Sequence, residues 1–282
     1  NAVNSFKTEG SGYKVLYPVP EKKAAVSLEN SIMGYPVLIL SFSYSGIAIS
    51  PDDHSEHFTT FENRNGDFIF NKYTRDLIWE TRCREILSES GFNSDDTLNY
   101  YLQDDNLKPV KDLHRVVEAL NRNYANLVSA GFTVSSRHLD KDYNLRTVSI
   151  EVINEMEGDW FDLRATIIVG EWKFPFIRFK NNIQKEIREF ELPDGSIAIL
   201  PAEWFTKYRN IFEFGRDQSG AIRIHKQHFP LLAEILKEEE KASYGYLEKL
   251  LIPEELPLPL KPAGLNCEMR AYQYEGLGWL FW

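Results

Sequence analysis

The sequence predicts an α+β fold in which small mixed and antiparallel sheets pack with helices, arranged as two subdomains. Three patterns lead to this prediction: short runs of β-branched and aromatic residues, stretches with apolar residues at helical spacing, and turns marked by Gly and Pro. With 43% hydrophobic and 26% charged residues, the composition is that of an ordinary globular protein. The length of 282 residues is enough for about two domains.

The first predicted subdomain covers residues 1–144. Strands are expected in three segments: Tyr13–Tyr17, Val37–Tyr44 and Ile47–Ile49. Between the last two, Ser45-Gly46 makes a turn. The stretch 51–66 is rich in Asp, His and Asn, so we expect an exposed loop there.

Two amphipathic helices are predicted in this subdomain. The apolar face of the first helix is formed by Trp79, Cys83, Ile86 and Leu87, and Gly91 is placed to end it. The second helix has apolar residues at helical spacing up to Gly131, namely Leu113, Val116, Val117, Leu120, Tyr124 and Leu127.

The second predicted subdomain covers residues 145–250, where the hydrophobic period changes to two. Strands are expected around Val148–Val152 and Phe161–Val169, and Asp194-Gly195 predicts a hairpin between Phe190–Leu192 and Ile197–Ile199. Further predictions are a short helix over 176–185, an amphipathic helix over 229–236, a Pro-rich linker over 251–264 and a separate segment over 265–282.

Charge and hydropathy exclude some classes of protein. The net charge of −10 argues against a nucleic-acid clamp on the surface of this chain. The longest apolar run, near Val37–Leu40, is far shorter than the roughly 20 residues that span a bilayer, so we expect no membrane partner. Cys83 and Cys267 are far apart in sequence and form no metal or redox motif, which favours the cytoplasm.

No complete catalytic or metal site is predicted from the residues themselves. His54 with His57, and His225 with His228, have the spacing of metal ligands but lack the H-E-x-x-H frame and a third ligand. Asp159 and Asp162 flank two aromatic residues, as general acids and bases sometimes do, but period two places Asp162 on the solvent side of a strand.

The segment 171–190 has two interpretations. Its basic residues alternate with Trp172, Phe174, Phe176 and Phe179, a mixture that could stack the bases of a single strand. The structural alternative, which we favour, is a helix and strand with aromatic residues inside and charges outside.

The segment 265–280 carries the most informative motif. Arg270, Tyr272, Gln273, Gly276, Trp279 and Leu280 resemble the L-R-P-Y-Q-x-x-G-x-x-W-L opening of the Swi/Snf family of DNA-translocating ATPases, members of helicase superfamily two. Ala271 departs from the Pro that is usual in the family. The resemblance implies that Gln273 contacts the adenine of ATP, with Arg270 as a second nucleotide-binding residue, since a Gln amide matches the N6 and N7 edge of adenine.

Upstream, the chain is similar to the accessory segment that precedes the motor in bacterial members of the family. The similarity covers 37–46, Arg75-Asp76 with Glu80, Gly91-Phe92 and, most strongly, 158–163, 169–170, 174–176 and 192–196 continuing to 200–204. We expect these positions to be structural: turns, strand aromatics and a helix start.

The resemblance implies an accessory region upstream of a truncated first ATPase lobe, with the ATPase core absent. The chain alone would then need no cofactor and would have no catalytic or metal-binding residue, whereas the full-length protein would use ATP and Mg²⁺. Implied partners are the ATPase lobes of the same polypeptide, double-stranded DNA through the motor, and a protein of the transcription machinery; the implied location is the cytoplasm, at the nucleoid. Two alternatives stay open: a stand-alone protein-interaction module and a metal-dependent enzyme using the histidine pairs.

Overall fold

The computed structural model describes residues 13–50, 53–64, 67–94, 99–157, 160–218, 221–225, 228 and 270–274. The chain forms two compact units, each built from two stretches of sequence: 1–151 with 166–205, and 152–165 with 206–282. Small mixed and antiparallel sheets with packed helices confirm the predicted α+β class. The subdomain boundaries predicted after residues 144, 250 and 264 stay predictions, and the linker 251–264 lies outside the described residues.

A mixed six-stranded sheet forms the centre of the first unit. Its strands follow the order β7-β8-β3-β2-β9, with β4 paired to β3. They are β2 (Lys22–Asn30), β3 (Pro36–Tyr44), β4 (Ile47–Ile49), β7 (Phe92–Asn93), β8 (Asn99–Leu102) and β9 (Phe132–Ser136). Strands β2 and β3 pair antiparallel along their whole lengths, whereas β9 joins β2 in parallel.

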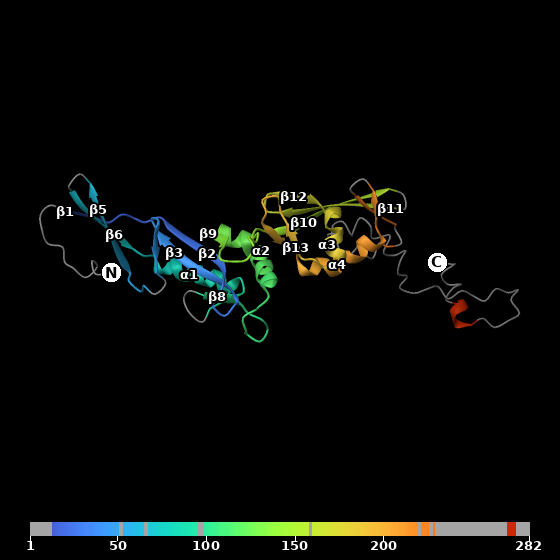
Figure 1. Cartoon of the computed structure of the whole chain (residues 1–282), viewed down its shortest axis with the longest axis horizontal. Coiled ribbons are helices and arrows are strands. Elements are labelled where there is room, and N and C mark those ends of the chain that lie inside the picture. The colour runs from blue at the N-terminus through green and yellow to red at the C-terminus, as the bar shows by residue number, and fades with distance from the viewer. Residues whose placement is uncertain are drawn as a thin grey trace. The chain divides into compact units, whose positions relative to one another are not determined.

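Helices α1 (Leu77–Glu89) and α2 (Leu113–Ser129) lie alongside this sheet (Figure 1). Asp76 and Asp112 begin them, because each carboxylate accepts a hydrogen bond from a backbone N–H of the first turn. Gly91 and Gly131 follow the two helices with φ of 87° and 90°, a conformation that glycine adopts at little cost. Both helices and their final glycines confirm the prediction from sequence.

The buried apolar faces of α1 and α2 join the sheet in one core cluster. Leu87, Val117 and Leu120 have no exposed surface, and Val26 and Leu28 from β2 are equally buried. This packing fixes the helices against the sheet, since fully burying one such side chain stabilises the folded state by about 1.5–3 kcal/mol.

A second, three-stranded sheet in this unit corrects the prediction for 51–66. It has the order β1-β6-β5, formed by β1 (Tyr13–Leu16), β5 (His57–Arg64) and β6 (Asp67–Thr74). Residues 57–64 are therefore a strand rather than a loop. Their composition suggested a loop, but β5 pairs with β6 in full register from His57–Thr74 to Arg64–Asp67, and Phe58 is buried against Tyr73.

The second half of the chain adds a five-stranded sheet, in the order β10-β11-β16-β15 with β12 paired to β11. Its strands are β10 (Val148–Glu157), β11 (Trp160–Val169), β12 (Trp172–Pro175), β15 (Arg216–Gln218) and β16 (Ala221–His225). The predicted hairpin is present as β13 (Glu189–Glu191) and β14 (Ile197–Ile199).

The second half of the chain also has a 3₁₀ helix at Phe176–Phe179, α3 (Lys180–Gln184) and α4 (Ala202–Phe214). The first two confirm the short helix predicted over 176–185. The helix predicted over 229–236 lies outside the described residues.

Candidate functional site

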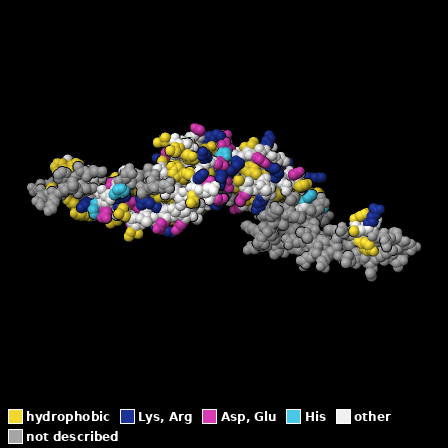
Figure 2. Space-filling model, turned by 90° about the horizontal axis from the view of Figure 1, so that it is seen from below, with side chains coloured by type: hydrophobic (Ala, Val, Ile, Leu, Met, Phe, Trp, Pro, Cys, Tyr) yellow, Lys and Arg dark blue, Asp and Glu magenta, His cyan; other side chains and the backbone are white. Residues whose placement is uncertain are grey.

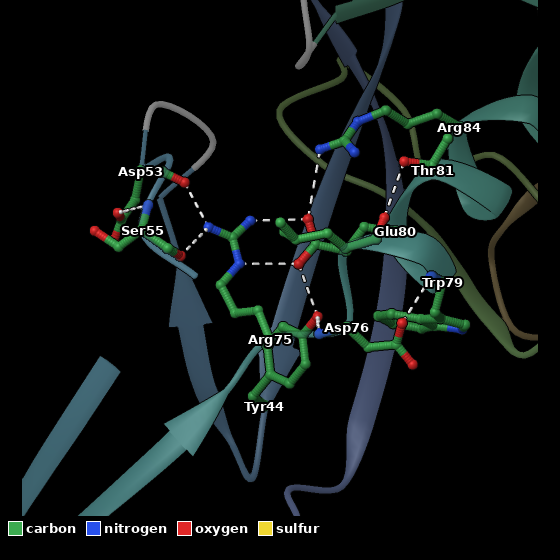
Figure 3. A network of polar contacts seen from close by, with 10 residues as sticks. Tyr44, Asp53, Ser55, Arg75, Asp76, Trp79, Glu80, Thr81 and Arg84 are labelled. Atoms are coloured by element: carbon green, nitrogen blue, oxygen red, sulfur yellow. Dashed lines mark hydrogen bonds and ion pairs between the residues drawn. The ribbon is translucent and has the colours of Figure 1, made fainter. Parts of the chain in front are cut away.

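The most densely connected polar site surrounds Glu80, in the first turn of α1 (Figure 3). Its carboxylate and the Arg75 guanidinium form a two-point ion pair: Arg75 Nε donates to Oε1 at 3.0 Å and Nη2 donates to Oε2 at 2.8 Å. The Glu80 side chain is fully buried and that of Arg75 is 5% exposed. A buried pair of this kind requires nearly every polar atom to have a partner, because desolvating the charges is costly.

Tyr44 supplies a third contact to the same carboxylate. The Tyr44 hydroxyl donates to Glu80 Oε1 at 2.7 Å and accepts the backbone N–H of Asp76 at 3.1 Å. Burial raises the pKa of the Tyr44 hydroxyl, and donation to Glu80 raises it further. Tyr44 therefore remains protonated at neutral pH and acts as a fixed hydrogen-bond donor.

Arg75 also holds the segment that leads into β5. Its Nη1 donates to the backbone carbonyls of Asp53 and Ser55. One guanidinium thus joins the start of α1 to the chain ahead of the three-stranded sheet, and donation to Glu80 raises its pKa. The similarity to accessory segments had singled out Arg75, Asp76 and Glu80 as structural positions, and the three form one network (Figure 3).

Arg84 is the member of the site that the sequence analysis missed. It lies one helical turn after Glu80, with Nη2 at 3.6 Å from Glu80 Oε2, and its guanidinium is 5.2 Å from the centre of the Phe42 ring. The spacing of four residues between Glu80 and Arg84 was the available signal, because such residues are neighbours on one helix face.

The chemistry of the Glu80 site is that of a binding or structural site. Arg75 and Tyr44 donate hydrogen bonds to the carboxylate and Arg84 lies within ion-pair distance, so both oxygens have partners within the fold. Cys83, the next buried polarisable group on α1, has its pKa raised by burial to about 11, which keeps the thiol protonated and unreactive.

Gln273 and Arg270, the predicted nucleotide-binding residues, lie together at the start of a helical turn over 271–274. The backbone N–H of Arg270 donates to Gln273 Oε1 at 2.9 Å. This is one half of a capping box, in which the third helical residue reaches back to the residue before the helix. Arg270 and Gln273 are both exposed. Trp279 and Leu280, assigned to packing, lie outside the described residues.

Three of the four paired histidines lie against other side chains. His57 Nδ1 is 3.1 Å from Thr74 Oγ1, the His225 ring meets the edge of Trp160, and His228 stacks on Phe214 at 4.7 Å. Within the described parts of the chain, no three His, Cys, Asp or Glu side chains gather closely enough to hold a metal ion.

Asp162 is a partner in an ion pair rather than a solvated carboxylate. It lies directly opposite Arg223 in the pairing of β11 with β16, and Arg223 Nε and Nη2 donate to its two oxygens at 2.6 Å each. Donation from Arg223 lowers the Asp162 pKa, which favours the ionised form and not a general acid. The predicted alternation is confirmed, with Phe161 and Leu163 buried; Asp159 lies outside the described residues.

The aromatic residues of 171–190 pack inward. Phe174, Phe176 and Phe179 are each at most 5% exposed, and Arg178 lies over the rings of Phe174 and Phe190 at 5.4 and 5.6 Å. The structural interpretation is confirmed, because buried rings have no face left for a nucleotide base. On the face shown in Figure 2, Lys and Arg are interspersed with Asp and Glu over the described surface.

The comparisons with known proteins give no relative. No protein-family model matches the chain, and no curated protein or solved structure is significantly similar to it. None of the helices in the described ranges has the length and apolar character needed to cross a membrane.

Replacing Glu80 by Gln should destabilise the fold strongly. The E80Q variant leaves two guanidinium groups without a counter-charge, and breaking one partner of a buried pair costs about 3–5 kcal/mol. Urea unfolding measures the free energy of unfolding. The control is Glu85→Gln on the same helix, whose exposed pair with Arg82 contributes about 1 kcal/mol or less; equal losses in both variants would contradict the assignment.

The Asp162–Arg223 pair should make the free energy of unfolding depend on pH in the acid range. Since the folded pKa of Asp162 lies below the ordinary value of about 3.9, the contribution of the pair is complete above about pH 5 and disappears as pH falls through the folded pKa. Asp162→Asn should lower the free energy of unfolding by about 1–3 kcal/mol at pH 7. In strong acid the variant and the wild type should have equal free energies of unfolding. Thermal unfolding from pH 2 to 7 measures this difference. The control is Asp217→Asn, an exposed substitution on β15, which should have the same free energy of unfolding as wild type at each pH.

Proposed function

We propose that this chain is the accessory and regulatory region of a bacterial Swi/Snf-type ATPase, which couples ATP hydrolysis to translocation on double-stranded DNA. The observation that carries the proposal is the motif Arg270-Ala271-Tyr272-Gln273 with Gly276, Trp279 and Leu280. In this proposal the chain docks on the ATPase lobes of its own polypeptide, works in the cytoplasm at the nucleoid, and contacts a protein partner in transcription.

The geometry at Gln273 is compatible with reading adenine. A carbonyl oxygen accepts two hydrogen bonds, and Gln273 Oε1 has accepted one from Arg270 N–H. The second lone pair is available for the N6 amino group of adenine, while the side-chain NH₂ can donate to N7. The bond to Arg270 also limits rotation of the amide, so less entropy is lost when a nucleotide binds.

The chain itself lacks the parts that hydrolyse ATP. Its sequence has no Gly-rich loop ending in Lys-Ser or Lys-Thr, which is the usual cradle for the phosphates. ATP and Mg²⁺ are therefore assigned to the full-length protein, and the 282-residue chain alone is proposed to be inactive.

A protein-interaction module is the second candidate, favoured by the aromatic face of the three-stranded sheet. Phe61 lies 5.7 Å from Phe68 and 5.4 Å from Phe70, and Tyr13 continues the cluster at 6.0 Å from Phe70. Phe61 and Phe68 are 55% and 45% exposed. Clustered exposed aromatic residues are typical of a surface that binds another protein. The gene sequence beyond Trp282 separates the candidates, since the first requires a phosphate loop there.

A nucleotide-selectivity assay tests the role of Gln273. In the full-length protein, Gln273→Ala should raise KM for ATP about tenfold or more and bring it close to KM for GTP, because hydrogen-bond readout of the base is lost. The 282-residue chain should release no phosphate from ATP with Mg²⁺. Gln184→Ala, on α3, serves as the control. Turnover by the chain alone, or unchanged selectivity in Q273A, would contradict the proposal.

The regulatory role has a separate test. Deleting residues 1–250 from the full-length protein should change its DNA-stimulated ATPase rate, because the accessory region is proposed to shift the motor between conformations. Phosphate release with and without duplex DNA measures the effect. Identical stimulation in both proteins would remove the regulatory role while leaving the nucleotide assignment intact.

A further inference from the structure

Strand β9 leaves one edge of the six-stranded sheet open. It is the last strand of that sheet, and its only partner among the described strands is β2. The Arg137 N–H donates to the carbonyl of Leu28 on β2, so every second residue before Arg137 also turns its backbone groups to β2. The backbone groups of Val134 and Ser136 therefore face away from the sheet, where they have no hydrogen-bond partner in the described structure.

The segment that connects β9 to β10 has a second run of unpaired backbone groups. The Asn144 N–H donates to Ile197 of β14, and the Ile197 N–H donates to Asp142, so these two residues face the hairpin. By alternation, Tyr143 and Leu145 turn their N–H and C=O groups away from β14. These groups have no hydrogen-bond partner in the part of the chain that the structure describes, although Tyr143 and Leu145 are only 8% and 5% exposed. Unpaired backbone groups on buried residues are costly, so a partner that bonds to them is favoured.

One groove, which we call the β9 groove, lies between these two edges. It is lined by β9 at 134–136, the connecting segment at 142–146, Tyr124 of α2, and Asp194 and Ser196 of the hairpin turn. Its volume of about 340 Å³ is within the range of sites that bind small ligands. All four residues with unpaired backbone groups contribute to this lining, so a ligand in the groove can bond to both edges at once.

The charged side chains that line the β9 groove favour a basic ligand. Asp142 and Asp194 are both exposed carboxylates. The cation of the lining, Arg146, pairs with Glu171 at 3.0 Å. The Ser136 hydroxyl donates to Asp142 Oδ1 at 3.0 Å, which ties the two edges together at one end and leaves the second carboxylate oxygen for a ligand.

The loop that joins the two edges does not cancel this negative charge. Within 137–141, Lys141 pairs with Glu189 of β13, and the charge of Asp140 offsets that of Arg137. The groove therefore complements a Lys or Arg side chain.

We propose that the β9 groove binds an extended, basic peptide segment of a partner protein as an added β-strand, with a Lys or Arg side chain beside Asp142. A strand has N–H and C=O groups on both of its edges, at the two-residue spacing of the unpaired groups in the groove. Main-chain hydrogen bonds supply the affinity, and the carboxylates select the basic side chain. The groove borders a different sheet from the aromatic face of β5 and β6, and the proposal depends on neither proposed function.

Titration of the 282-residue chain with a synthetic peptide tests the groove. The probe is an acetylated and amidated hexapeptide of alternating Lys and Val, and its control is the same peptide with every backbone amide N-methylated. We expect the probe to bind saturably, and hydrogen exchange of the Val134, Ser136 and Tyr143 amides to slow about tenfold or more at saturation, because they exchange only while the peptide is dissociated. The amides of Thr133 and Ser135 face β2, so their exchange should not change. The N-methylated peptide should not bind, since it has no N–H to donate.

Two variants and a second probe make the test specific. Val134→Pro removes an N–H that faces the groove but no bond to β2, so it should weaken probe binding about tenfold. The control Val134→Thr keeps that N–H and should bind the probe like wild type. A hexapeptide of alternating Glu and Val should bind about tenfold more weakly than the Lys peptide.

The exchange measurement on the wild-type chain decides the matter even if Val134→Pro does not fold. Three results would overturn the proposal: no saturable binding of the Lys peptide at millimolar concentration, binding that leaves exchange at Val134 and Ser136 unchanged, or equal binding of the N-methylated peptide. Equal binding of the Glu peptide would overturn the assignment of a basic partner.

Discussion

The buried carboxylate of Glu80 is the constraint on which the first unit depends. It receives Tyr44 from the six-stranded sheet and Arg75 from the end of the three-stranded sheet, while its own backbone belongs to α1. These polar contacts add to the packing of the Tyr44 ring against Phe58 of β5 and Trp79 of α1, so the three elements are fixed at one point. Because a carboxylate without these partners could not remain buried, the network also selects one arrangement of the three elements over other compact arrangements.

Two other polar side chains, those of Asn121 and Glu189, also fix segments of the chain through hydrogen bonds. Asn121, buried on α2, donates through Nδ2 to the carbonyls of Asn144 and Arg146 and so holds the segment leading into β10 against the helix. Glu189 accepts from Lys141 and His114, and both interactions lower its pKa. In each case one polar side chain fixes a connecting segment whose own sequence would permit many conformations.

The sequence predicts a helix, strand or turn correctly where the pattern that defines it lies within a few neighbouring residues. Helices α1 and α2, strand β3 and the hairpin at Asp194-Gly195 each have periodicity or a turn signal within a few residues. Strand β5 was missed because its Asn, Glu and His residues resemble a loop, and its strand character comes from pairing with β6. The Asp162–Arg223 pair joins residues on different strands, so no spacing rule could reveal it. The buried cluster around Glu80 needed Tyr44 and Arg75 to be brought together by the fold.

Among the strands that the structure describes, β1 pairs only with β6, in parallel, and the segment between them includes the whole of β2 to β5. The β5–β6 hairpin, in contrast, needs only the few residues of its turn to close. Since closing a long loop costs more entropy than closing a short one, β1 has no edge to join until the hairpin exists. We therefore expect β1 to be the last strand added during folding and the first to detach, so that its amides exchange with solvent well before those of β2 and β3.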